Sequence, residues 1–312
     1  MSTAHAPRLT DFAFPLGAVL MWSGNMVVTK MSAGVISPST ISFYRWLIAG
    51  LALTPFVAAG VWRNRAAIAP YLGKLCVLGA LGMAVFQGLA YTAAATTTAT
   101  NMGFITSLVP LLTIAVGALI LREATRVNAV VGGVISLAGI SVLISHGDPT
   151  SLLSVGINQG DFLMFLAAAG YAVYGVLVRK WAIPISSWQS LYVQIAFGIL
   201  LQLPIFLSFP ATPLNAGNLP IVLYAATFPS LFAPYLWLRA IGRLGPARAS
   251  MFVNLTPVFT VLIAAVMLAE PVAGYHVVGG AITLAGVMLA QWRPAAHKAA
   301  RHKSSGGADS RH

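Results

Sequence analysis

One arginine, Arg45, lies deep in an apolar segment, seven residues after Pro38. If that segment spans a membrane, an arginine near its middle costs about 2.5–3.5 kcal/mol, so the guanidinium must face other helices and find partners there. It could bind the carboxylate of a solute. Alternatively it is structural, hydrogen-bonded to carbonyls and to an acid at the outer end of a helix, such as Glu270 or Asp161.

The six acidic residues lie at the ends of apolar segments, in connectors or in the C-terminal tail. They are Asp11, Glu123, Asp148, Asp161, Glu270 and Asp309. A carboxylate inside the membrane is the usual proton relay and the usual counter-ion for a cationic solute. This placement favours a neutral or zwitterionic solute. Transport could proceed without ion coupling, or a histidine or a water chain could take the place of the carboxylate. No cluster has the spacing of metal ligands or of a nucleophile and its base, so the sequence predicts no catalytic residue, no metal and no cofactor.

Polar and aromatic residues recur at helical spacing, and they are the candidate substrate-binding residues. Trp22 and Asn25 share one helix face, as do Gln87 and Tyr91 on another segment. The complete set of candidates is Trp22, Asn25, Gln87, Tyr91, Asn101, Tyr171, Tyr174, Tyr235 and Asn254. An apolar pocket with a few convergent polar groups suits an aromatic amino acid. For each aromatic residue the alternative is packing against lipid or against other helices.

Two prolines, Pro110 and Pro257, lie at equivalent places within apolar segments. Proline removes a helical hydrogen bond and kinks the helix. These residues could be hinges that let one half of the molecule move against the other, or fixed kinks that shape a cavity.

Composition identifies the class of protein. Apolar residues make up 58% of the chain and charged residues 8%, against roughly 25% charged in a typical soluble domain. We therefore expect an integral membrane protein in contact with lipid. The net charge of +12 does not indicate nucleic acid, because the basic residues sit at segment ends and in the tail and no nucleic-acid-binding motif frames them.

Ten segments are long and apolar enough to cross a bilayer whose core needs about 20 residues per helix. They span roughly residues 11–33, 38–60, 71–95, 99–121, 126–145, 159–180, 185–208, 218–242, 246–268 and 272–292. If both termini are cytoplasmic, 16 of the 18 lysines and arginines fall on the inner side, as the positive-inside rule requires. Only Lys30 and Arg45 do not.

The chain also contains an internal repeat. Residues 107–140 match residues 254–287 at 14 of 34 positions, including Pro110/Pro257 and Glu123/Glu270. A repeat of five helices must insert its second copy upside down, which gives the inverted-repeat plan of many transporters. The predicted organisation is a cytoplasmic N-terminus (1–10), a first repeat (11–145), an external connector (146–158), a second repeat (159–292) and a basic cytoplasmic tail (293–312).

These features resemble the EamA family of the drug/metabolite transporter superfamily. The resemblance rests on the paired helix–Glu–turn–helix units around Glu123 and Glu270, the runs that begin at Val131 and Val278, and the stretch FYRWLIAG that contains Arg45. It implies ten transmembrane helices in two lobes and a central cavity lined by helices 1, 3, 4, 6, 8 and 9. Within the family, the sequence resembles the branch of YddG-type aromatic amino-acid exporters in its overall similarity.

The resemblance and the residues together predict a transporter of the bacterial inner membrane, not an enzyme. It would export small neutral or zwitterionic metabolites, aromatic or hydrophobic amino acids first, by alternating access. The alternatives are export of another metabolite or drug on the same fold, or a membrane-embedded enzyme. Small residues in the fifth and tenth helices, such as Gly132 and Gly279, could pack within one chain or between two, so the protein could be a monomer or a homodimer.

Overall fold

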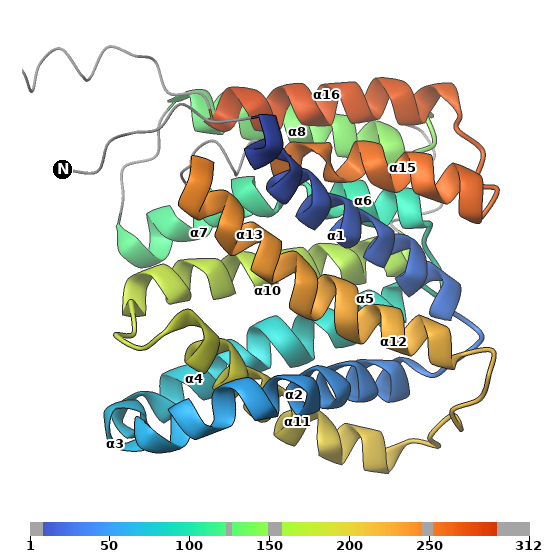
Figure 1. The fold of residues 1–312 in the computed structure, drawn as a ribbon. Coiled ribbons are helices and arrows are strands. Elements are labelled where there is room, and N and C mark those ends of the chain that lie inside the picture. The colour runs from blue at the N-terminus through green and yellow to red at the C-terminus, as the bar shows by residue number, and fades with distance from the viewer. Residues whose placement is uncertain (1–8, 123–126, 149–157, 245–251, 292–312) are drawn as a thin grey trace, which may run out of the picture.

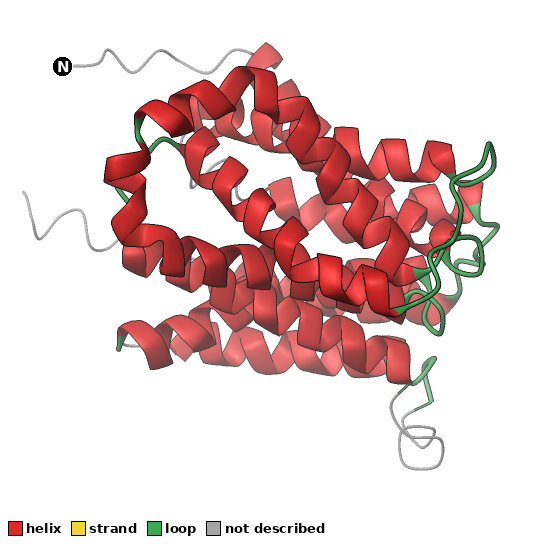
Figure 2. Ribbon diagram, turned by 90° about the horizontal axis from the view of Figure 1, so that it is seen from below, coloured by secondary structure: helices red, strands yellow, loops and turns green. Residues whose placement is uncertain are grey.

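In a computed structural model the chain is helical, and the structure describes residues 9–122, 127–148, 158–244 and 252–291. No strand occurs within these ranges (Figure 2). The helices of the first half are η1 (Leu9–Phe12), α1 (Ala13–Ser32), α2 (Pro38–Arg63), α3 (Arg65–Ile68), η2 (Ala69–Tyr71), α4 (Leu72–Gly79), η3 (Ala80–Val85), α5 (Phe86–Ala93), α6 (Ala99–Thr106), α7 (Val109–Leu121) and α8 (Val127–Ile144). Those of the second half are α10 (Gln159–Trp181), α11 (Ser187–Ser208), α12 (Leu219–Thr227), η4 (Phe228–Phe232), α13 (Ala233–Leu244), η5 (Phe252–Leu255), α15 (Thr256–Met267) and α16 (Gly274–Gln291).

Within the ranges that the structure describes, seven helical stretches are long and apolar enough to cross a membrane, which makes this a multi-pass membrane protein. They are Thr10–Ser32, Pro38–Arg63, Arg65–Ala93, Ala99–Leu121, Gln159–Trp181, Ser187–Ser208 and Leu219–Trp237. Three shorter apolar helices, Val130–Leu143, Phe252–Met267 and Gly274–Leu289, accompany them. The helical class is as the sequence predicts, and the count of ten spans remains a prediction.

At one edge of the molecule α8 and α16 lie side by side (Figure 1). A Cβ atom on Gly286 would lie 2.5 Å from the Gly132 carbonyl oxygen, and one on Gly279 would lie 2.8 Å from the Gly139 oxygen. Ser136 Oγ donates a hydrogen bond to the Thr283 carbonyl at 2.9 Å. Residue numbers rise along one helix as they fall along the other, so the two helices are antiparallel. Small residues let the backbones touch.

At the opposite edge α2 and α11 form a second antiparallel pair (Figure 1). Gly50 faces Ile199, and the Tyr192 and Thr54 hydroxyls are 3.0 Å apart. Between the two edges, α1 packs on α13 and α15 from the second half. In the same way α10 packs on α5 and α7 from the first half.

The turn between α5 and α6 contains no glycine, proline or charged residue, and side chains from elsewhere in the fold hold it in place. Lys30 Nζ donates to the Ala94 carbonyl at 2.9 Å, and Asn158 Nδ2 donates to the Thr96 carbonyl at 2.6 Å. Thr98 caps α6 by accepting from the backbone N–H of Asn101. The chain therefore breaks here because of tertiary contacts and a threonine cap.

Candidate functional site

Arg45 lies at the centre of a buried polar cluster, and its side chain is 3% exposed. Its Nε donates to Ser230 Oγ at 2.9 Å. Its Nη1 lies within donating distance of three acceptors: Asn25 Oδ1 at 3.0 Å, Gln87 Oε1 at 3.1 Å and the Tyr91 hydroxyl at 3.2 Å. All five side chains carry a polar or charged group that would be costly to bury without such bonds. We call these five residues the Arg45 cluster.

The cluster joins four helical segments from both halves of the chain. Asn25 comes from α1, Arg45 from α2, and Ser230 from η4. Gln87 and Tyr91 are four residues apart on α5, a spacing that puts two side chains on the same helix face. Three of the nine candidate binding residues, Asn25, Gln87 and Tyr91, are thus brought together around one guanidinium.

No carboxylate in the described part of the chain pairs with Arg45. Glu270 accepts instead from the backbone N–H groups of Ala99 and Thr100, at 2.9 and 3.2 Å. Asp161 accepts from the Thr97 hydroxyl and from Asn101 Nδ2. The alternative in which one of these two acids neutralises Arg45 is therefore wrong, since both bind the start of α6.

The third guanidinium nitrogen of Arg45, Nη2, has no protein partner among the described residues. This atom is not one of the fully enclosed polar atoms without a partner. A buried cation held only by neutral dipoles is costly unless an anion approaches it. The geometry therefore leaves a buried positive charge whose Nη2 N–H groups have no acceptor among the described residues.

Two π-helical turns, η3 and η4, lie at equivalent places in the two halves, 148 residues apart at their first residues. In η4, Ser230 Oγ donates to the Ala225 carbonyl at 2.8 Å while it accepts from Arg45. The Pro229 carbonyl accepts from Trp22 Nε1 at 3.3 Å. Such turns free backbone carbonyls and are frequent at functional sites. Ser230 is not among the sequence candidates; Pro229 within a helix was the signal that could have found this turn.

The candidate aromatic residues form two groups on the two π-helical turns. The Trp22 ring lies 5.4 Å from the Trp237 ring, beside η4. The Tyr171 and Tyr174 rings lie 5.2 Å apart, and a Cβ atom on Gly82 of η3 would be 3.0 Å from the Tyr174 ring. Neither group bonds Arg45 directly.

The remaining candidates lie outside the cluster. Asn101 lies in α6 and bonds Asp161. Asn254 lies partly buried in η5 and makes no hydrogen bond with the cluster. Pro110 and Pro257 are the second residues of α7 and α15, where a proline costs no helical hydrogen bond. A two-residue break, 107–108, precedes α7.

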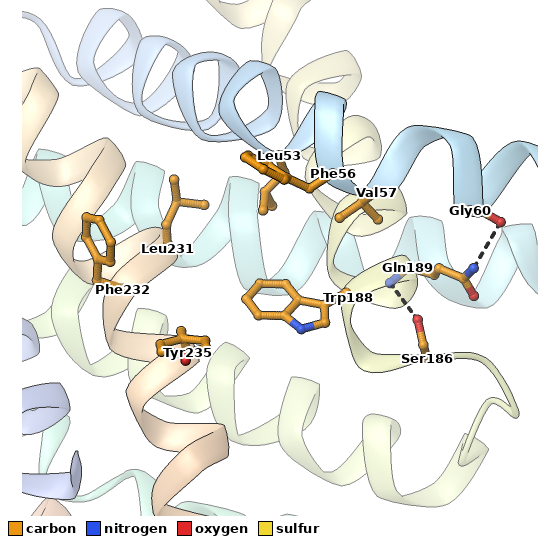
Figure 3. A pocket seen from close by; sticks show the side chains of 10 residues that line it. All are labelled: Leu53, Phe56, Val57, Gly60, Ser186, Trp188, Gln189, Leu231, Phe232 and Tyr235. Atoms are coloured by element: carbon orange, nitrogen blue, oxygen red, sulfur yellow. Dashed lines mark hydrogen bonds between the residues drawn. The ribbon is translucent and has the colours of Figure 1, made fainter.

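Tyr235 lines a groove of about 640 Å³, together with residues of α2, of the α11 N-terminus and of η4 (Figure 3). The other lining residues are Leu53, Phe56, Val57, Gly60, Ser186, Trp188, Gln189, Leu231 and Phe232. Trp188 projects into the space between the α2 and η4 side chains (Figure 3). No group of three His, Cys, Asp or Glu side chains that could hold a metal occurs among the described residues.

The fold is a bundle of antiparallel helices with a buried polar centre, which is that of a multi-pass membrane protein. Comparison with known proteins identifies its family. The model of the EamA-like transporter family matches residues 11–145 and again residues 158–292. The chain belongs to this family.

The chain is similar to several curated proteins over nearly its whole length. It is 24% identical to the uncharacterized transporter YyaM of Bacillus subtilis, over 91% of this chain and 94% of that protein. It is 26% identical to the protein PecM of Dickeya dadantii, over 91% and 92%. It is 22% identical to a probable terminal-alkyne amino-acid exporter of Streptantibioticus cattleyicolor, over 87% and 90%.

A solved crystal structure has the same fold. It superposes with a TM-score of 0.57 and 22% sequence identity, and the match covers 95% of this chain and 99% of that chain. The likeness concerns the fold alone.

Proposed function

We propose that this protein exports small neutral or zwitterionic metabolites from bacteria, and that its cargo is an amino acid with an aromatic or hydrophobic side chain. The observation that carries the proposal is the Arg45 cluster: a buried guanidinium with four neutral partners and a free Nη2. A carboxylate suits the free Nη2, because hydrogen bonds between a guanidinium and a carboxylate are charge-assisted and stronger than those to neutral acceptors.

The rest of the cargo would lie beside the aromatic groups on the π-helical turns. Trp22 approaches the cluster from the same helix as Asn25, three residues earlier. Tyr174 is equivalent to Asn25 in the second half and packs on η3. Aromatic faces bind aromatic and aliphatic side chains, and amide or phenol groups bind an amino-acid backbone. The amino-acid exporter among the similar proteins supports this class of cargo.

We propose further that the seven long and three shorter apolar helices are ten spans, arranged as two inverted repeats over 11–145 and 159–292. The support is the α8–α16 contact, in which equivalent residues meet reciprocally: Gly139 faces Thr283 and Gly286 faces Ser136. Equivalent helices that pack antiparallel across a two-fold axis must run in opposite directions through the membrane. This contact also uses the small-residue faces within one chain.

Alternating access would follow from this arrangement. At the outer end, Glu270 and Asn158 hold the turn before α6, and so join the two halves there. Opening this end to release cargo requires those bonds to break, with Pro110 and Pro257 at the starts of the helices that would move. Because every acid of the sequence lies at a segment end, in a connector or in the tail, transport would need no ion coupling.

A second candidate on the same fold is export of another metabolite or a drug. It would share the Arg45 cluster if its cargo carried an acidic group. Most of the similar proteins are named as transporters, which weighs against an enzyme.

The test is uptake into liposomes that contain the purified protein. Labelled phenylalanine, tryptophan, threonine and lysine are supplied with and without a pH gradient. We expect saturable uptake of the aromatic amino acids without a gradient. If uptake occurs only with a gradient, the protein is still an exporter but the uncoupled mechanism is wrong. If none of the four moves in either condition, the cargo assignment is wrong.

A further inference from the structure

The groove between α2, α11 and η4 is separate from the Arg45 cluster, although it starts beside it. Ser230 of η4 faces Arg45, and the next two residues, Leu231 and Phe232, line the groove. Leu53, on the groove wall, lies eight residues after Arg45 along α2. The groove therefore occupies the half of α2 that leads to Arg63.

The groove lining is apolar and opens sideways out of the bundle. Phe56, Phe232 and Tyr235 are 84%, 52% and 44% exposed, although each lines it. In a membrane protein such faces contact acyl chains, not water. Its polar groups, Ser186 and Gln189, lie together at the start of α11, where Gln189 Nε2 donates to the Gly60 carbonyl at 3.0 Å (Figure 3).

Basic residues flank the same end of the groove from two sides. On α2, Gly60 lines the groove and the exposed Arg63 follows it, and Arg65, also exposed, begins α3. On α13, Arg239 is exposed one turn beyond Tyr235, and its guanidinium lies 5.9 Å from the Tyr235 ring. Arg239 makes no salt bridge within the described residues.

The dimensions fit one lipid chain. Leu53 and Arg63 are ten residues apart, which is about 15 Å along a helix at 1.5 Å per residue. That is half of a hydrocarbon core of about 30 Å, or the depth of one leaflet. Trp188 and Tyr235 lie near the basic end, and such residues are enriched at the level of lipid headgroups.

We propose that this groove binds an anionic phospholipid, with an acyl chain between α2, α11 and η4 and its phosphate beside Arg239. In the orientation proposed above, the lipid belongs to the cytoplasmic leaflet. Because Leu231 and Phe232 lie in the same π-helical turn as Ser230, an occupied groove supports η4 where that turn holds Arg45. The lipid is thus a structural ligand next to the solute site.

Native mass spectrometry of the full-length protein tests the proposal. The protein is given equal amounts of palmitoyl-oleoyl phosphatidylglycerol and phosphatidylcholine, and the retained lipid is weighed. We expect one phosphatidylglycerol retained in preference to phosphatidylcholine. Arg239→Gln should lower this preference about fivefold, the effect of one basic residue beside an anionic lipid. Lys180→Gln, an exposed lysine of α10 that does not line the groove, is the matched control and should leave it unchanged.

A second variant, Val57→Trp, fills the groove and should reduce retention of both lipids. Equal retention of the two lipids by the unmodified protein would overturn the proposal, as would an equal effect of Lys180→Gln and Arg239→Gln. If Val57→Trp abolishes phenylalanine uptake but leaves lipid retention intact, the groove belongs to the cargo. If it instead dissociates a dimer, the occupant is a second copy of the chain. Lipid retention is measured without transport, so the lipid-binding proposal can fail while the exporter function holds, and the reverse.

Discussion

Replacing Arg45 with methionine separates a role in binding the cargo from a role in holding the fold. Methionine is unbranched and apolar and keeps much of the volume of the arginine stem. Removing one member of a buried, hydrogen-bonded charge pair costs about 2–5 kcal/mol. Since 1.4 kcal/mol is a factor of ten, the affinity for a cargo carboxylate should fall at least about 30-fold.

The assay is competition against labelled phenylalanine uptake by phenylalanine and by phenethylamine, which lacks the carboxylate. The unmodified protein should prefer phenylalanine strongly. Arg45→Met should lose most of that preference, because the group that distinguishes the two molecules has no partner left. Such a cycle isolates one pairwise interaction. Gln194→Met is the matched control: Gln194 is equally buried at the equivalent place of α11 but bonds Ser190, so the preference should remain.

The reasoning is refuted if Arg45→Met lowers the thermal stability and the uptake rate but keeps the ratio between phenylalanine and phenethylamine. Arg45 would then be a structural residue whose four partners serve only to bury it. Arg45→Lys distinguishes charge from geometry. Lysine keeps a positive charge but not the planar fork, so it should restore part of the preference but not the full affinity.

Four further variants follow from the contacts. Gly286→Ala should destabilise the protein by about 1–3 kcal/mol and lower its melting temperature, because the added Cβ would lie 2.5 Å from backbone atoms of α8. The control is Gly133→Ala, whose Cβ would meet nothing within 4 Å, and it should leave the melting temperature unchanged. Glu270→Gln should cost about 1 kcal/mol in the same melting assay, since it weakens the cap on α6; no change would show that the cap adds nothing. Ser230→Ala should weaken phenylalanine uptake several-fold with little change in melting temperature, and an unaltered rate would separate η4 from transport. Tyr174→Ala should reduce uptake of tryptophan more than of threonine, and equal losses would remove Tyr174 from the aromatic subsite.

Much of the fold is readable from the sequence because the membrane imposes a strong pattern. Runs of about 20 apolar residues with basic ends specify where helices lie, and the repeat around Glu123 and Glu270 relates the two halves. The small residues of α8 and α16 also predict close packing, and the structure places them in contact within one chain. Lipid cannot hydrogen-bond the backbone, so each span must form its own helical hydrogen bonds, and the local sequence pattern therefore predicts the helix.

The site is less readable, since it depends on contacts between distant segments. Helical spacing places Gln87 and Tyr91 on one face, but it does not reveal that the same guanidinium also bonds Asn25 and Ser230. The alternative that pairs Arg45 with an acid is wrong for the same reason: Glu270 binds the start of α6, a contact 170 residues away in the chain. A π-helical turn leaves no periodic signal, which is why Ser230 was missed.

The most direct test of the central claim is a crystal structure of the protein with phenylalanine bound. The account predicts that a carboxylate oxygen of the cargo lies about 2.7–2.9 Å from Nη2 of Arg45, the distance of a charge-assisted hydrogen bond. Phenylalanine bound elsewhere, with Arg45 still held only by its four neutral partners, would contradict it.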